Sequence, residues 1–213
     1  MIVSKEWHVY SYKKPSIFIN FEGIDNTGKS NLVADIQKEL HEVITVYTTS
    51  ELNTDVGSLI LTKLYNKLLD PYEKVLLFAA DRQKRYSKDM KDKLKSKCLF
   101  LSDRWFFSAI AYRCAEDPSI RGYVREVNKI FILPDFTFYI DISANESIKR
   151  GKSLNKNRYL KTYLNKVRKE YLSLIIEYNF IKINGMRKYN LIKDEIINKI
   201  KELLKYTQLK IKE

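Results

Sequence analysis

The sequence is poor in the residues that interrupt a chain or cross-link it. Its 213 residues include only six glycines, four prolines and two cysteines. Glycine and proline are scattered, so no linker, repeat or low-complexity tract divides the chain, and we expect a single domain over residues 1–213. Cys98 and Cys114 lie in apolar surroundings without the spacing of metal ligands. This excludes a disulfide framework and predicts two buried thiols in a reducing compartment.

Long apolar runs are missing as well. No run approaches the roughly 20 residues that a membrane-spanning helix needs. The segment from Met1 to Glu6 begins no apolar stretch of a secretory signal. We therefore expect a cytoplasmic protein with no membrane partner. Histidine is also scarce, because His8 and His41 are the only two and both lie outside every motif described below.

Acidic residues are fewer than basic ones. The 39 lysines and arginines exceed the 26 aspartates and glutamates, which gives a formal charge of +13. The lysines between Lys84 and Lys97 recur at helical spacing and fit a solvated helix face. A positive field also suits a protein that handles anionic nucleotides. Binding to nucleic acid is therefore not expected as the main function.

The most informative segment that is present is a complete phosphate-binding loop pattern, G-x-x-x-x-G-K-S, at residues 23–30. It follows an apolar run at 16–21 and opens a helix-period stretch. Backbone N–H groups of such a loop converge on an anion at a helix N-terminus. Lys29 would reach the β- and γ-phosphates, and Ser30 would offer its hydroxyl to Mg²⁺. The predicted triphosphate site comprises Gly23, Ile24, Asp25, Asn26, Thr27, Gly28, Lys29 and Ser30.

Five apolar, strand-like runs alternate with helix-period segments. We expect strands at 17–21, 43–48, 98–102, 136–142 and 180–183. We expect helices at about 29–41, 57–69, 72–96, 105–130, 156–178 and 190–206. Continuously apolar strands indicate a sheet covered on both faces, and the alternation predicts a parallel, three-layer α/β fold. Ligands of such folds bind beyond the carboxyl ends of the strands. Residues 1–14 precede the pattern as an N-terminal extension whose function is not readable.

The third predicted strand ends in Asp103-Arg104. An acidic residue at this position holds Mg²⁺ in P-loop folds, usually through water. Motor ATPases commonly place a glutamate next to that aspartate, whereas Arg104 is suited to clamp phosphate. No N-K-x-D segment for reading guanine occurs. These features favour phosphoryl transfer to a small acceptor over a motor ATPase or a GTPase.

Five further segments form a recognisable series: F-E-G-I-D at 21–25, L-L-F-A-A-D-R at 76–82, D-R-W-F-F-S-A-I-A-Y at 103–112, P-D at 134–135 and V-R-K-E-Y-L at 167–172. Taken in this order, they resemble the thymidylate kinases from about residue 16 to 205. The resemblance implies a P-loop kinase fold with a five-stranded parallel sheet flanked by helices and a short lid. It also implies ATP- and Mg²⁺-dependent conversion of dTMP to dTDP, and a homodimer.

The resemblance assigns roles to individual residues. Phe78 and Arg82 share a helix face at i and i+4, and in the family these positions contact thymine. Arg104 would bind the acceptor phosphate and Asp25 the sugar hydroxyl. Ser108 continues the spacing of Arg104 at i+4 and would face the same crevice. The predicted acceptor site is Asp25, Glu51, Phe78, Arg82, Arg104, Ser108 and Tyr112, and the predicted metal site is Ser30 and Asp103.

Residues from about 143 to 160 resemble the family's lid. Thymidylate kinases place a basic residue either in the P-loop or in the lid, and Asn26 and Thr27 are uncharged. The cation is therefore expected in the lid, where arginines neutralise the charge of the moving phosphoryl group. Closure of a lid also excludes water. The predicted catalytic residues are Lys29, Arg104, Arg150 and Arg158.

The segment after the second strand departs from the family. An arginine that helps to hold the acceptor phosphate is usual there, but this chain has Glu51 followed by Leu52. Deoxynucleoside kinases share the fold and place a glutamate base at this point, so a nucleoside kinase with Glu51 as base is an alternative. A monophosphate acceptor needs no base, because its second pKa of about 6 makes it largely dianionic at pH 7. The third alternative is a nucleotide-binding module, associated with nucleic acid, in which dTMP capture is weakened.

Overall fold

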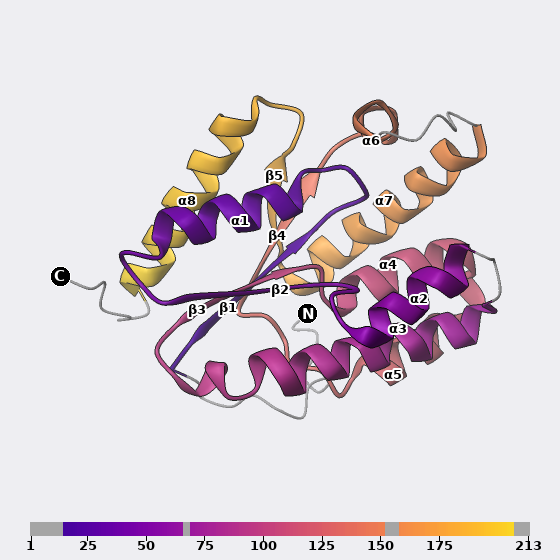
Figure 1. The fold of residues 1–213 in the computed structure, drawn as a ribbon. Coiled ribbons are helices and arrows are strands. Elements are labelled where there is room, and N and C mark those ends of the chain that lie inside the picture. The colour runs from indigo at the N-terminus through magenta and orange to yellow at the C-terminus, as the bar shows by residue number, and fades with distance from the viewer. Residues whose placement is uncertain (1–14, 66–68, 152–157, 207–213) are drawn as a thin grey trace.

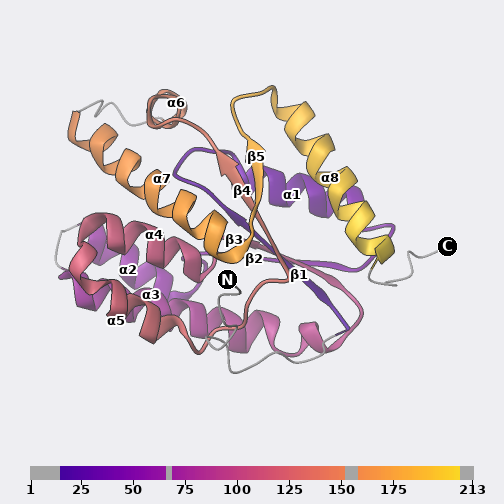
Figure 2. The same ribbon diagram turned by 180° about the vertical axis from the view of Figure 1, so that it is seen from behind.

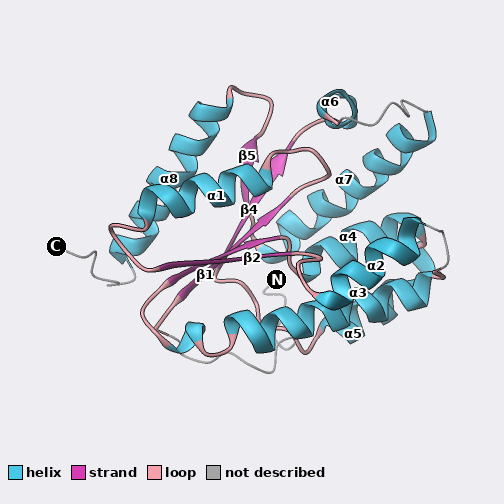
Figure 3. Ribbon diagram, in the orientation of Figure 1, coloured by secondary structure: helices cyan, strands magenta, loops and turns pink. Residues whose placement is uncertain are grey.

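The computed structural model describes residues 15–65, 69–151 and 158–206. Five strands form one sheet in the order β2-β3-β1-β4-β5, and every neighbouring pair runs parallel (Figure 3). The strands are β1 (Ile17–Glu22), β2 (Val46–Ser50), β3 (Leu99–Asp103), β4 (Phe136–Asp141) and β5 (Ile181–Asn184). The predicted α/β fold with a five-stranded parallel sheet is confirmed.

Helices cover both faces of this sheet. They are α1 (Lys29–Leu40), α2 (Asp55–Tyr65), α3 (Pro71–Arg85), α4 (Phe106–Glu116), α5 (Arg121–Asn128), α6 (Ala144–Arg150), α7 (Arg158–Tyr178) and α8 (Tyr189–Tyr206). Helices α1 and α8 lie on one face, whereas α3, α4, α5 and α7 lie on the other (Figure 1). Seen from behind, α7 and α8 flank β4 and β5 from opposite sides (Figure 2). Within the described part of the chain, no helix has the length and apolar character required to span a bilayer.

Two hydrophobic clusters lie on the two faces of the sheet, because successive side chains of the central strand β1 point to opposite faces. Phe18 contributes to the cluster under α3, α4, α5 and α7, and its neighbour Ile19 contributes to the cluster under α1 and α8. Both side chains are 0% exposed. Trp105 packs edge-on against Phe18, with ring centroids 5.5 Å apart. The sheet is therefore buried on both faces, as its continuously apolar strands predict.

Two expected helices are shorter than the sequence pattern indicates. The prediction of one helix at 105–130 is wrong, because α4 stops at Glu116. Pro118 has no amide hydrogen to continue the helix, and Asp117 instead accepts a hydrogen bond from the Ser119 backbone N–H. The α-helix expected at 72–96 ends at Arg85. A π turn at Tyr86–Met90 and a separate 3₁₀ turn at Lys93–Lys95 follow it. The start of α3 is well defined, because Asp70 and Glu73 form a capping box.

Two smaller differences concern element boundaries near the site. The strand expected from residue 43 begins at Val46, since the backbone N–H groups of Val43 and Ile44 both bond to the carbonyl of Leu40 and close α1. Helix α6 was not predicted. Its N-cap Ser143 accepts a hydrogen bond from the backbone N–H of Glu146, and this S-x-x-E spacing is the signal that could have revealed it.

Candidate active site

The loop between β1 and α1 has the backbone geometry of an anion-binding loop. Gly23, Asn26 and Gly28 all have positive φ, at 153°, 59° and 90°. A Cβ atom at Gly23 would lie 2.7 Å from the carbonyl oxygen of Ile140, so this position requires glycine. Gly28 immediately precedes α1, which places the loop at the positive end of that helix. The loop can therefore hold an anion at the carboxyl edge of the sheet.

Lys29 is held inside this loop by the loop's own oxygen atoms. Its Nζ donates to the carbonyls of Gly23 (3.1 Å) and Ile24 (3.0 Å) and to Thr27 Oγ1 (3.0 Å). The side chain is buried. Burial lowers the pKa of Lys29 to about 8, and the nearby Arg104 acts in the same direction. A phosphate that entered the loop would favour the charged form of this amine.

Ser30 and Asp103, the two predicted metal ligands, lie together. Ser30 Oγ donates a hydrogen bond of 2.5 Å to Asp103 Oδ2, which joins the first turn of α1 to the end of β3. A hydroxyl and a carboxylate are hard oxygen ligands of the kind that Mg²⁺ prefers. Because they meet beside the phosphate-binding loop, these residues fit a magnesium ion that accompanies a triphosphate.

Arg104 lies at the centre of the predicted acceptor site. Its backbone has a left-handed φ of 69°, which turns the side chain away from β3. The guanidinium donates to Asp25 Oδ1 at 2.6 Å, Ser108 Oγ at 3.1 Å and Tyr112 Oη at 3.2 Å. Tyr112 also donates to Asp25 Oδ1 at 2.9 Å. The structure thus brings four of the predicted acceptor residues into one hydrogen-bonded group.

Glu51 lies between two arginines that are distant from it in the sequence. Its carboxylate is 3.8 Å from Arg104 Nε and 3.9 Å from Arg82 Nη2. Burial raises the pKa of Glu51, although the arginines act in the opposite direction. Arg82 is itself buried, donates to Asn128 Oδ1 at 2.6 Å and lies over the ring of Phe131 at 5.1 Å. No arginine lies near Glu51 in the sequence, but the fold brings Arg82 and Arg104 next to its carboxylate.

Phe78 occupies a different environment from Arg82, although both belong to α3. It is half-buried and belongs to neither hydrophobic cluster. The guanidinium of Arg113 lies 5.6 Å from the centre of its ring. Phe78 is therefore not a core residue, and its stacking against a base stays a prediction.

Leu52 takes up the position where the family arginine is expected, at a constrained turn between β2 and α2. Its φ is 66°, and its backbone N–H donates to Asp81 Oδ2 at 3.1 Å. Thr54 Oγ1 donates to the other oxygen of the same carboxylate at 2.6 Å. A Cβ atom at Gly57 would lie 2.4 Å from the Leu52 carbonyl oxygen. The turn is thus held by α3 through Asp81 rather than by the side chain of Leu52.

Arg85 is a site residue that sequence reasoning missed. It is fully buried, and its Nη2 donates to Ser102 Oγ (2.9 Å) and to the Arg104 carbonyl (3.0 Å). Its Nε donates to Thr49 Oγ1 at 3.3 Å. It therefore ties the ends of β2 and β3 to the left-handed Arg104. Only its i+3 spacing from Arg82 could have indicated it. Glu22 and Tyr171, which lie behind Arg104, were also missed.

Helix α6, which belongs to the predicted lid, is attached to the phosphate-binding loop. Asn26 Nδ2 donates to the carbonyl of Ser147 at 3.1 Å, and Ser147 Oγ donates to the carbonyl of Asp25 at 2.8 Å. Arg150, at the end of α6, donates to the carbonyl of Gly185 at 2.9 Å. Residues 152–157 and the side chain of Arg158 lie outside the described part of the lid.

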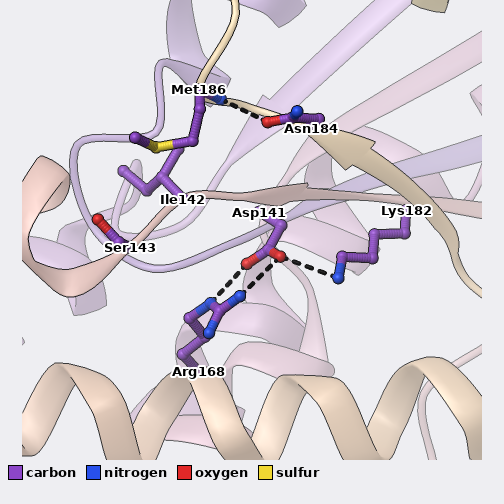
Figure 4. A pocket seen from close by; sticks show the side chains of 7 residues that line it. All are labelled: Asp141, Ile142, Ser143, Arg168, Lys182, Asn184 and Met186. Carbon is purple, nitrogen blue, oxygen red and sulfur yellow. Dashed lines mark hydrogen bonds and ion pairs between the residues drawn. The ribbon is translucent and has the colours of Figure 1, made fainter.

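A pocket of about 470 Å³ opens at the carboxyl ends of β4 and β5 (Figure 4). Asp141 is one of the residues that line the pocket, and Arg168 Nε (2.7 Å) and Lys182 Nζ (3.0 Å) both pair with its carboxylate. Burial acts to raise the pKa of Asp141, but these two partners outweigh it and lower the pKa. The pocket is lined by Asp141, Ile142, Ser143, Arg168, Lys182, Asn184 and Met186. The carboxyl ends of parallel strands are a usual position for ligands.

Comparisons with known proteins agree with this arrangement. A family model described as thymidylate kinase matches residues 21–196. A probable thymidylate kinase of Sulfurisphaera tokodaii is 34% identical over 88% of this chain and 97% of its own length. A thymidylate kinase of Mycoplasma genitalium is 28% identical over 88% of this chain and 93% of its own.

A solved structure supports the fold independently. The crystal structure of a thymidylate kinase from Ehrlichia chaffeensis matches with a TM-score of 0.69 and 24% identity, over 87% of this chain and 98% of that one. Because the family model covers most of the chain and the fold is the same, this protein belongs to the thymidylate kinase family.

Proposed function

We propose that this protein transfers the γ-phosphoryl group of ATP to dTMP, giving ADP and dTDP. The observation that carries the proposal is Arg104, which is held against Asp25 at the end of β3, directly beside the phosphate-binding loop. A cation at this point lies between a donor phosphate in the loop and an acceptor beyond Asp103. Such an enzyme acts mainly by positioning two anions and offsetting their repulsion.

On the donor side, Lys29 and the loop N–H groups bind the triphosphate. Lys29 would exchange its bonds to Gly23, Ile24 and Thr27 for bonds to phosphate oxygens. Ser30 and Asp103 would hold Mg²⁺, which supplies positive charge to the phosphate oxygens when it is bound. Arg150 and Arg158 would bring further positive charge from the lid.

On the acceptor side, Arg104 binds the phosphate and Asp25 the sugar. Phe78, Arg82, Ser108 and Tyr112 complete the acceptor site, with Glu51 holding Arg82 and Arg104 until the nucleotide enters. The acceptor phosphate is already nucleophilic at neutral pH, so no protein base is needed. The scarcity of histidine is compatible with this chemistry.

One observation favours a second candidate, a deoxynucleoside kinase. Burial raises the pKa of Glu51, which is a property of general bases that accept a proton from a hydroxyl. Against this role, the carboxylate lies close to both Arg82 and Arg104. The two candidates differ in the acceptor that they use, which is directly measurable.

An assay of ADP release with ATP and Mg²⁺ separates these candidates. The acceptors would be dTMP, dUMP, dCMP, thymidine and none. We expect dTMP to give the highest kcat/KM and thymidine no turnover, with Lys29→Met as the inactive control. Turnover of thymidine but not of dTMP would assign the protein to the nucleoside kinases. Absence of ADP release with every acceptor, together with tight, salt-dependent binding of DNA or RNA, would favour the binding module.

The proposal also includes a homodimer, as the family resemblance implies, and a cytoplasmic location, which the two buried free cysteines favour. Light scattering coupled to gel filtration would give the mass in solution. A mass close to one chain of 25.3 kDa at assay concentrations would reject the dimer without affecting the proposed reaction.

A further inference from the structure

A buried carboxylate, Glu22, lies at the end of β1 and is used by none of the steps described so far. Its side chain is 0% exposed. Oε1 accepts hydrogen bonds from Asn20 Nδ2 (3.0 Å) and from the Trp105 backbone N–H (2.9 Å). Oε2 accepts from Ser108 Oγ (2.5 Å) and Tyr171 Oη (2.8 Å). Four donors from three elements thus converge on one carboxylate.

The direction of these hydrogen bonds matters for Arg104. A guanidinium can only donate, so any hydroxyl that binds it must accept. Arg104 Nη1 lies 3.1 Å from Ser108 Oγ and 3.5 Å from Tyr171 Oη. Each hydroxyl has one proton, and the carboxylate of Glu22, which can only accept, is within hydrogen-bond distance of both. The lone pairs of both oxygens therefore remain available to Arg104.

Without this carboxylate the two hydroxyls have another option. Ser108 Oγ and Tyr171 Oη are 2.8 Å apart, so one can donate to the other. That arrangement would use one of the lone pairs that now face the guanidinium. A negative charge behind the pair keeps both protons turned inward, and it also attracts the positive charge of Arg104.

The outer contact of Arg104 is too weak to fix the side chain alone. The Asp25 side chain is 53% exposed, and ion pairs at such positions contribute little because water screens them. A free arginine side chain also has many rotamers to lose on binding. The inner contacts, to Ser108, Tyr171 and Tyr112, are therefore needed to define where the guanidinium points, and Glu22 acts on the first two of them.

We propose that Glu22 is a positioning residue for Arg104, which acts through the Ser108 and Tyr171 hydroxyls. It holds the guanidinium toward Asp25 and the acceptor phosphate before the nucleotide arrives. The part that concerns the phosphate rests on the proposed function. The part that concerns the orientation of Arg104 rests on the hydrogen bonds alone.

Glu22→Gln is the sharpest test, since it keeps the shape and replaces one acceptor oxygen by a donor. We expect KM and Kd for dTMP to rise about tenfold to a hundredfold, by analogy with the loss of a group that orients a metal ligand. KM for ATP should stay unchanged, and Glu22→Asp should recover part of the dTMP affinity. In an Arg104→Lys background, Glu22→Gln should cause little further rise in KM or Kd for dTMP.

Asp135→Asn is the matched control. It removes a carboxylate that accepts a hydrogen bond of 2.6 Å from the Phe18 backbone at the opposite end of β1. This variant should lower Tm without changing KM for dTMP. An unchanged dTMP affinity in Glu22→Gln, an equal rise of both KM values, or full additivity with Arg104→Lys would overturn the proposal.

Crystal structures of the wild type and of Glu22→Gln give a readout that does not depend on activity. We expect Arg104 to leave Ser108 in the variant, and an unmoved guanidinium would reject the positioning role. Wild-type protein that releases no ADP with dTMP would instead reject the proposed function. The two failures are therefore distinguishable.

Discussion

At the scale of single residues, Lys29 is an amine kept out of water before its ligand arrives. Its pKa falls from 10.5 to about 8, mainly because burial disfavours the charged form. Between about pH 8 and 10.5 the folded chain therefore holds fewer protons than the unfolded chain. The contribution of Lys29 to stability consequently improves as the pH rises through this window. Ligand binding should reverse part of the shift.

We predict that ATP binding takes up protons near pH 8. Phosphate oxygens favour the ammonium form, so chains in which Lys29 is neutral must gain a proton when ATP binds. Calorimetry in two buffers of different ionisation enthalpy measures this uptake. It should be clear at about pH 8, nearly absent at about pH 6, and absent in Lys29→Met at both. Equal uptake at the two pH values would contradict the assignment of the shift to Lys29.

At the scale of elements, the turn between β2 and α2 determines the least familiar part of the site. The backbone of Leu52 has a positive φ, and its N–H donates a hydrogen bond to the Asp81 carboxylate. Gly57 lies against the Leu52 backbone, where a Cβ atom would not fit. The turn therefore depends on glycine at position 57 and on a carboxylate from α3. It does not depend on the side chain that replaces the family arginine.

Gly57→Ala should damage this turn. A Cβ atom 2.4 Å from the Leu52 carbonyl oxygen forces the backbone to move, at a cost of about 1–3 kcal/mol in the free energy of unfolding. KM for dTMP should rise, because Glu51 precedes Leu52. Gly122→Ala in α5 is the matched control, since a Cβ there has nothing within 4 Å. It should stabilise the protein by about 0.5–1 kcal/mol. Urea unfolding measures both, and two variants of equal stability would refute the steric argument.

Much of the secondary structure is predictable from the local spacing of apolar residues in the sequence. The five strands and the phosphate-binding loop follow from continuous apolar runs and from a motif whose residues act through their own backbone. The break at Asp117-Pro118 was missed because the apolar spacing continues across it. Arg85 could not be predicted, because a buried arginine depends on partners from β2, β3 and the Arg104 turn. The same holds for Glu51, whose cationic neighbours come from other elements.

At the scale of the whole molecule, one sheet serves two hydrophobic clusters. Phe18 of the central strand belongs to one cluster, and Ile17, Ile19 and Phe21 belong to the other, so neither face can lose its cover without exposing β1 to water. The prediction of a single domain over residues 1–213 stays a prediction, and the shared sheet concerns only the part of the chain that the structure describes.

We predict that the two faces unfold together. Ile196→Ala removes a 0% exposed side chain from the α8 face, and should cost about 2–5 kcal/mol. Trp105 reports on the other face, provided that Trp7 is replaced by Phe. Urea midpoints from Trp105 fluorescence and from far-UV circular dichroism should shift equally. A Trp105 midpoint that stays in place while the dichroism midpoint falls would show that the faces unfold separately.

The polar and charged groups of the candidate site bond to one another. Lys29 is bonded to loop carbonyls, Arg104 to Asp25, and Ser30 to Asp103. A ligand must therefore exchange partners with the protein rather than fill an open space. A neutral inhibitor of the size of the nucleotide would displace water from these charged groups without offering them an opposite charge. Compounds selected against this enzyme should accordingly carry a permanent anion or a close mimic of one, and the main obstacle to their use in cells would then be membrane permeability.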